Sequence, residues 1–155
     1  MTIALSPRNE DGQALVEFAL VLPVLVLILF GMIHFGKAVN YWNDATHLTA
    51  EAARFAAVDR KPDPSSAASL QAQILGQADT KELREGKTDS VVSPARVCVD
   101  FPNGTSNVGD PVRVKMTFSY SWMPLLDLVP GTLPITSSTV MRLEARPTNY
   151  AAGCA

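Results

Sequence analysis

The stretch that decides the fold is Phe18-Ala-Leu-Val-Leu-Pro-Val-Leu-Val-Leu-Ile-Leu-Phe-Gly-Met-Ile33, which contains no charged and no polar side chain. Together with residues 14–16 before it and residues 34–36 after it, the segment is about 23 residues long. A helix of that length, rising about 1.5 Å per residue, crosses a hydrocarbon core of about 30 Å. Pro23 is tolerated in such a helix as a kink. The sequence therefore predicts a single-span membrane protein.

A cleaved secretory signal is a second interpretation of the same segment. The apolar run is longer than the usual length of about 7–15 residues, and no small-x-small cleavage site follows it. The preceding residues include Arg8 but also Glu10 and Asp11, so they form no basic leader. We therefore favour a retained helix, and a secreted soluble domain remains the lesser alternative.

Glu17 is a carboxylate with apolar neighbours near the start of this segment. A charge at the centre of a bilayer costs at least about 2.5 kcal/mol, and less near the interface, so it normally has a partner. One interpretation is that Glu17 merely reaches the lipid headgroups. The other joins Glu17 to Gly12, because Gly12-Gln-Ala-Leu-Val-Glu17 at the edge of an apolar segment is the pattern of a prepilin processing site.

This pattern implies that a membrane prepilin peptidase cuts after Gly12 and makes Gln13 the new N-terminus. Glycine suits the site because it has no side chain to exclude when the backbone enters the peptidase in extended form. The freed amine of Gln13 is a cation, which Glu17 of a neighbouring subunit neutralises in a helix bundle of low dielectric constant. We expect this pairing, at Glu17 and the adjacent Phe18, to set the axial register between subunits.

The residues Gly12-Gln-Ala-Leu-Val-Glu-Phe-Ala-Leu-Val-Leu-Pro23, followed by Phe30-Gly31 and Phe35-Gly36, resemble the TadE-like pseudopilins of tight-adherence (Flp-type) pilus systems. The similarity extends to Ala53-Arg54-Phe55-Ala56-Ala57-Val58. It implies a minor pilin or pseudopilin in the bacterial inner membrane, with an extracytoplasmic C-terminal domain. The partners that it implies are the prepilin peptidase, other pilin or TadE/TadF-like subunits, the inner-membrane assembly platform and membrane lipid.

Two features leave an uncleaved alternative open. Asp11 stands directly before Gly12, where related pseudopilins commonly have a basic residue, and some relatives keep the leader as an anchor. The charges near the membrane edges, Arg8 on one side and Lys37 and Arg54 on the other, do not decide the orientation, which follows from the resemblance. The alternative function is therefore a membrane-anchored extracytoplasmic binding module.

The helix is expected to continue beyond the membrane, because no helix breaker occurs between Gly36 and Pro62. Apolar side chains recur there at alternating spacings of three and four, which predicts one rod from Gln13 to Val58. The recurring positions are Ala38, Tyr41, Ala45, Leu48, Ala52 and Phe55. We expect the outer half of this stripe to cover the chain's own domain, and the membrane half to pack against other subunits.

The remaining residues are expected to form a small α+β domain. Pro62 and Pro64 mark a loop, and a short helix follows, with Ser65 or Ser66 as its N-cap and Gly86 as its end. Alternation with a period of two predicts three antiparallel strands, within residues 91–101, 112–120 and 135–143. A helix on one face of such a sheet completes the unit. The expected organisation is a leader at 1–12, a transmembrane helix at 13–36, its continuation at 37–60 and the domain at 61–155.

Two further groups of side chains in this domain are candidate sites. Cys98 and Cys154 lie beyond the apolar segment, so a disulfide is chemically permitted if this side is extracytoplasmic. A disulfide requires Cα atoms about 4.4–6.8 Å apart, and the sequence alone does not specify that distance, so two unlinked thiols stay an alternative. A proline-rich loop carries Trp122, Met123, Leu125 and Leu126, which either enter the core or form a contact patch for a subunit or a membrane surface.

No catalytic motif is found. His34 and His47 have no second ligand at a spacing that suits a metal, and neither lies in the domain, which therefore lacks the usual general base. There is no Gly-x-Ser-x-Gly turn and no phosphate-binding glycine loop. The net charge is -2, with basic and acidic side chains interspersed, so there is no electrostatic footprint for nucleic acid. We expect neither enzymatic activity, nor a cofactor, nor a metal.

Overall fold

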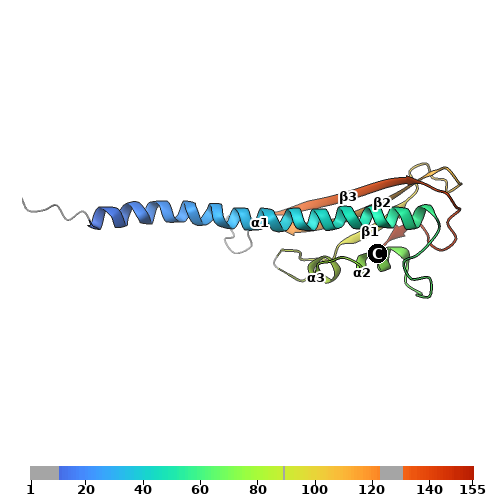
Figure 1. The fold of residues 1–155 in the computed structure, drawn as a ribbon, viewed down its shortest axis with the longest axis horizontal. Helices are drawn as coiled ribbons and strands as arrows, with labels where there is room; N and C mark the ends of the chain where they lie inside the picture. The colour runs from blue at the N-terminus through green and yellow to red at the C-terminus, as the bar shows by residue number, and fades with distance from the viewer. Residues whose placement is uncertain (1–10, 89, 123–130) are drawn as a thin grey trace, which may run out of the picture.

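The computed structural model describes residues 11–88, 90–122 and 131–155. Its largest element is α1, Asp11–Ala57, a helix of 47 residues with Pro23 inside it. At 1.5 Å per residue this helix is about 70 Å long. Its N-terminal half projects away from the other elements, and its C-terminal half lies along the sheet (Figure 1).

The other elements form a small α+β unit around that outer half. The helices α2 and α3 span Leu70–Gly76 and Lys81–Glu85, and the strands are β1 (Arg96–Asp100), β2 (Pro111–Ser121), β3 (Thr132–Arg142) and β4 (Gly153–Cys154). The strands pair antiparallel in the order β3-β2-β1-β4. The predicted fold class, a long N-terminal helix on a small antiparallel sheet, is confirmed.

The predicted stripe of α1 packs on this sheet. Tyr41, Ala45, Leu48 and Ala52 are buried, and the ends of the stripe are partly buried against the same core. Alanine positions let the helix approach closely, and the buried side of β2 supplies the opposing layer. That layer consists of Val112, Val114, Met116, Phe118 and Tyr120. The expectation that the outer half of the rod covers the chain's own domain is confirmed.

A row of hydroxyl groups joins α1 to β3 beside this apolar layer. We call it the hydroxyl seam, and it consists of Thr46 and Thr49 of α1 with Ser137 and Thr139 of β3. The Thr49 and Ser137 hydroxyls are buried and 3.1 Å apart. Ser137 also donates to Thr46 at 3.3 Å, and Thr139 donates to Thr49 at 3.4 Å. Each buried hydroxyl therefore has a partner on the facing element.

The C-terminal segment returns to the end of α1. The Tyr150 hydroxyl donates to the Ala56 carbonyl at 2.8 Å, and its burial raises the pKa of Tyr150 to about 12. The Asp59 carboxylate accepts the backbone N–H groups of Thr148 and Asn149 at 2.8 and 2.9 Å. These contacts fix residues 148–150 against the end of α1.

The predicted single helix after residue 65 is instead two helices. α2 begins after Ser69, whose hydroxyl accepts the Ala72 N–H, so neither Ser65 nor Ser66 is the N-cap. Ser65 donates both its N–H and its hydroxyl to Asp63, and this local turn competes with helix capping. The Asp44 carboxylate of α1 accepts the Asp79 N–H between α2 and α3, where the chain is not helical.

Two details of the sheet also differ from the prediction. β3 begins at Thr132 rather than at Ile135, and it includes Pro134. Since β3 is an edge strand, the missing N–H of proline interrupts no ladder. β4 is a fourth strand, and it pairs Cys154 with Cys98 and Gly153 with Val99. A strand of two residues carries no readable alternation, so the sequence pattern does not reveal it.

Candidate functional site: the N-terminal half of the long helix

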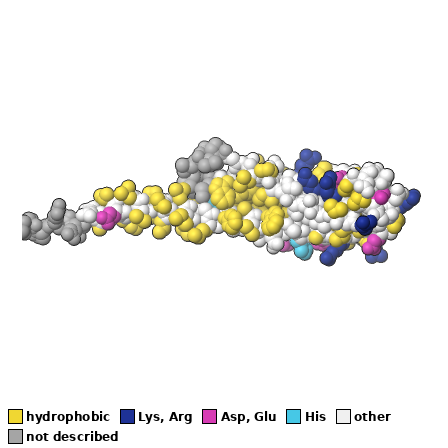
Figure 2. Space-filling model, turned by 90° about the horizontal axis from the view of Figure 1, so that it is seen from above, with side chains coloured by type: hydrophobic (Ala, Val, Ile, Leu, Met, Phe, Trp, Pro, Cys, Tyr) yellow, Lys and Arg dark blue, Asp and Glu magenta, His cyan; other side chains and the backbone are white. Residues whose placement is uncertain are grey.

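The apolar half of α1 is uncovered by the other described elements. Its large hydrophobic side chains stay exposed from Leu15 to Phe35 apart from partial burial at Val26 and Phe30. Among the described residues it is the one helix that is long and apolar enough to cross a membrane. Figure 2 shows the apolar side chains along this half, with an acidic side chain near its start. The helix fits a membrane anchor, and the other described elements all follow it in the sequence.

Gly12 and Glu17 both lie in the first turns of this helix. Nothing stands within 4 Å of the point where a Cβ on Gly12 would lie, so the described residues do not shield this position. Glu17 is the seventh residue of α1, one turn after Gln13. A helix begins with N–H groups that have no partner within the helix, so its first turn unwinds more easily than its interior.

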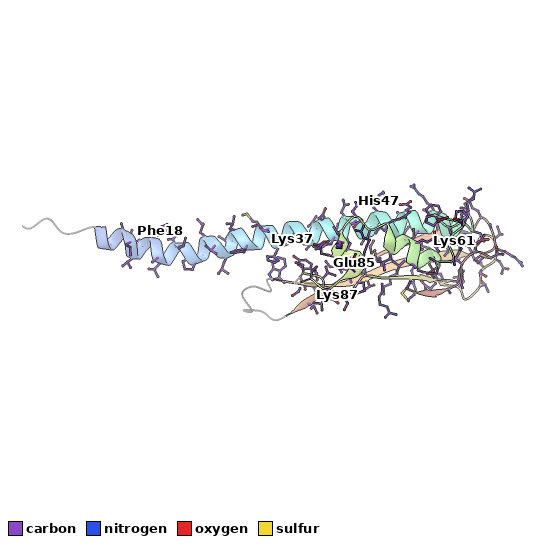
Figure 3. All side chains as sticks on the ribbon, turned by 90° about the horizontal axis from the view of Figure 1, so that it is seen from below. Phe18, Lys37, His47, Lys61, Glu85 and Lys87 are labelled. Carbon is purple, nitrogen blue, oxygen red and sulfur yellow. A yellow bond between two sulfur atoms is a disulfide. The ribbon has the colours of Figure 1, made fainter. Side chains whose placement is uncertain are left out.

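The structure gives Glu17 a partner that the sequence interpretation did not name. The side-chain amide of Gln13 donates to Glu17 Oε1 at 3.1 Å, one turn away on the same face of the helix. The spacing of four residues is a sufficient signal for such a pair, because side chains at i and i+4 are neighbours on a helix. Phe18 lies outside this pair, exposed on the helix surface (Figure 3).

His34 marks the point where the domain meets the exposed half of α1. The Tyr120 hydroxyl of β2 donates to the His34 carbonyl oxygen at 3.0 Å, and its oxygen lies 3.2 Å from His34 Nδ1. The Tyr120 hydroxyl thus contacts both the backbone and the ring of His34. The Trp122 ring lies 6.1 Å from the His34 ring and 6.5 Å from that of Tyr120.

This aromatic group continues into the core through Tyr41. Its ring lies 5.8 Å from that of Tyr120 and 6.3 Å from that of Phe118. Burial is the main cause that raises the pKa of both Tyr41 and Tyr120, so both stay neutral hydrogen-bonding groups at physiological pH. Sequence reasoning missed Tyr120, because its partner His34 is 86 positions away and no local pattern joins the two.

The remaining predicted residues lie elsewhere. Cys98 and Cys154 are joined in the structure, with their sulfur atoms 2.00 Å apart, at the β1–β4 end of the sheet. Trp122 is partly buried against the core, whereas Met123, Leu125 and Leu126 fall outside the described residues. In the ranges that the structure describes, no three His, Cys, Asp or Glu side chains are grouped in a way that suits a metal ion.

Comparison with known proteins gives one family. The family model described as TadE-like protein matches residues 12–54. The match begins at Gly12, includes Gln13 and Glu17, and ends within the outer half of α1. Searches of curated proteins and of solved structures found no match.

Proposed function

We propose that this protein, whose residues 12–54 match the TadE-like family of tight-adherence pilus components, is a minor pilin or pseudopilin that a prepilin peptidase processes after Gly12. The main support is the position of Gly12 and Glu17, in the first turns of an uncovered apolar helix and inside the matched region. The domain lies on the extracytoplasmic side of the inner membrane, where a Cys98–Cys154 disulfide is chemically favoured.

The proposed cleavage is a hydrolysis of the peptide bond between Gly12 and Gln13. Water adds to the Gly12 carbonyl carbon and the C–N bond breaks, which leaves a Gly12 carboxylate and a Gln13 amine. In α1 this bond lies in the first helical turn, so the turn must unwind before the peptidase can bind the backbone in extended form. No side chain of the described residues stands within 4 Å of a Cβ built on Gly12, which favours that approach.

The new amine changes the charge balance of the helix end. A cation at a helix N-terminus is unfavourable with respect to the helix dipole, and it is more costly in lipid. Glu17 of an adjacent subunit neutralises it, while Glu17 of the same subunit keeps the Gln13 side-chain amide. The pairing between the Gln13 amine and Glu17 of the adjacent subunit fixes the axial register of neighbouring helices, at Glu17 and Phe18. The assembly includes other pilin or TadE/TadF-like subunits and the inner-membrane platform.

The decisive experiment is mass spectrometry of the mature N-terminus, from membranes of cells with and without the prepilin peptidase. We expect a peptidase-dependent start at Gln13. A start at Met1 or Thr2 in both strains refutes processing and leaves the anchored binding module. A start beyond Gly36 identifies a secretory signal instead.

Two glycines of α1 provide a matched pair of variants. Among the described residues outside the local helix backbone, none has an atom within 4 Å of a Cβ added at Gly12 or Gly36, so the helix tolerates both Gly12→Leu and Gly36→Leu. We expect only Gly12→Leu to abolish the Gln13 start, because only that side chain enters the peptidase. Equal processing of the two variants would show that the peptidase does not recognise Gly12.

A further inference from the structure

The end of the domain nearest the apolar half of α1 carries a group of apolar side chains, exposed except for the partly buried Trp122, which we call the basal patch. It consists of Phe35, Val39 and Trp42 of α1, Trp122 at the end of β2, and Leu133 of β3. Phe35 is 63% exposed, Trp42 53% and Leu133 54%. Figure 2 shows apolar side chains continuing from the helix onto this end of the domain, while most of the charged side chains lie over its far part.

The basal patch contains two hollows along β3. A shallow groove of about 280 Å³ is lined by Trp122, Gly131, Thr132 and Leu133. A second, of about 340 Å³, is lined by side chains of α1 and β3, among them Val39, Trp42 and Ile135. Flexible apolar chains fill such grooves more easily than a rigid surface does, and acyl chains are flexible.

The level of the patch along α1 can be derived from the contacts of His34. The Tyr120 hydroxyl donates a hydrogen bond to the His34 carbonyl oxygen at 3.0 Å. This bond holds the end of β2, and Trp122 after it, at the level of His34 along α1. A hydrocarbon core needs about 20 helical residues, so a core that starts at Ala14 ends at Ile33. If Glu17 stays among the headgroups, a core of the same thickness of about 20 residues runs from Phe18 to Lys37. In both placements His34 and Trp122 lie within about one turn of the hydrocarbon edge.

The chemistry of the patch suits that level. Tryptophan is enriched where one end of the ring meets apolar chains and the other meets headgroups and water. The sequence has 2 tryptophans, Trp42 and Trp122, and both belong to the basal patch. Lys37 stands on the same stretch of α1, where its long side chain extends toward the headgroups while its stem covers apolar surface.

We propose that the basal patch seats the domain on the extracytoplasmic lipid surface, with Trp122 and Leu133 in the boundary between headgroups and acyl chains. Lipid is the occupant because the patch is continuous with the exposed apolar half of α1 and lies at its membrane edge. The seating requires that α1 span the membrane, but it depends neither on cleavage at Gly12 nor on incorporation into a pilus.

Depth-dependent tryptophan fluorescence tests this seating in the full-length protein. The background variant Trp42→Phe with Trp122→Phe removes both native reporters, and single reporters are then added. Leu133→Trp and Val140→Trp are matched in exposure, since both positions lie on β3 and are 54% and 55% exposed, and they project from opposite faces of the strand. Val140 lies about 23 Å farther along the strand, at 3.3 Å per residue. Leu25→Trp reports on the membrane span.

Each reporter is measured in phosphatidylcholine–phosphatidylglycerol vesicles without bromine, with bromine on the acyl chains close to the headgroup, and with bromine near the chain ends. We expect the reporter at 133 to lose emission with bromine close to the headgroup, the reporter at 25 to lose it with bromine near the chain ends, and the reporter at 140 to keep it in all vesicles. Protection of the reporter at 133 from aqueous iodide should accompany that loss.

Three results overturn the seating. Protection from iodide without loss of emission to bromine, for the reporter at 133, identifies a second subunit as the occupant. Equal quenching at 133 and 140 indicates unspecific adsorption of the whole domain. An unquenched reporter at 25 refutes the membrane span itself, and the seating with it, whereas the N-terminal sequence separately decides the processing at Gly12.

Discussion

Replacing both Cys98 and Cys154 by serine is expected to destabilise the domain strongly. The bond joins positions separated by 56 residues, a closed loop that contains β2 and β3. The chain-entropy relation gives a loss of about 14 cal/mol/K from the unfolded state, or about 4 kcal/mol at 25 °C. That is a large share of the roughly 5–15 kcal/mol by which small domains are stable.

The local structure supports a large effect at this position. β4 has only two residues, and beside the disulfide it is held by reciprocal backbone hydrogen bonds between Val97 and Ala155, of 3.0 and 2.9 Å. Without the disulfide these edge bonds are exposed to competition from water. We therefore expect the C-terminal segment to detach first and the unfolding midpoint to fall by roughly 15–30 °C, at about 4–8 °C per kcal/mol.

The assay is urea unfolding of the full-length protein in detergent micelles, followed by pulse proteolysis of the domain. The wild type should become as unstable as the double serine variant when dithiothreitol is added, and the variant should not respond to it. The single variant Cys154→Ser should match the double variant. A wild type that ignores the reductant, or a loss below about 0.5 kcal/mol, would refute the assignment of about 4 kcal/mol to this link.

Three smaller changes test other contacts. Partial burial alone would raise the pKa of Asp59, but hydrogen bonds from Thr148 and Asn149 outweigh it and hold the pKa below its usual value. The stability that Asp59 contributes is thus present above the unfolded pKa of about 3.9, and it is lost as the pH falls through the lower pKa of the folded state. Asp59→Asn should therefore flatten the acid side of a curve of unfolding free energy against pH, and an unchanged acid side contradicts this. Tyr120→Phe removes the donor to His34 and should cost about 1 kcal/mol in urea unfolding, and a neutral result contradicts the bond. Ala52→Leu overfills a position that is 0% exposed between α1 and the sheet and should cost about 1–3 kcal/mol, unlike the same change at the partly exposed Ala50.

The long helix and its packing face could be predicted because their signals are local. A run without breakers between Gly36 and Pro62 defines the outer half of α1, and the three-four spacing from Tyr41 to Ala52 identifies its buried side. The alternation of residues 112–120 likewise identifies β2, since each buried position repeats at the period of a strand. In both elements the side chains that the sequence periodicity places on one face are the ones buried in the fold.

The features that could not be predicted depend on distant or competing contacts. Ser69 rather than Ser65 caps α2, and Ser65 lies in a local turn in which its N–H and hydroxyl donate to Asp63. The contact between His34 and Tyr120 joins positions 86 apart, so it exists only after the sheet is placed on α1. At the candidate site, Gly12 and Glu17 were readable from their pattern, whereas the Gln13 amide as the partner of Glu17 needed the helix geometry.

The hydroxyl seam has a mechanical consequence. Sliding α1 along β3 by one turn would separate Ser137 from Thr49 and Thr46, its two partners on α1, whereas Thr49 would keep its bond to the Thr46 carbonyl. An axial load on the exposed half of α1 is therefore transmitted to β3 without slippage. Because α1 lies along β3, the load reaches the eleven-residue β2–β3 ladder in shear, where all of its hydrogen bonds share it at once (Figure 1). In force spectroscopy, we expect the domain to resist a pull along the helix better than a pull that opens the ladder from one end.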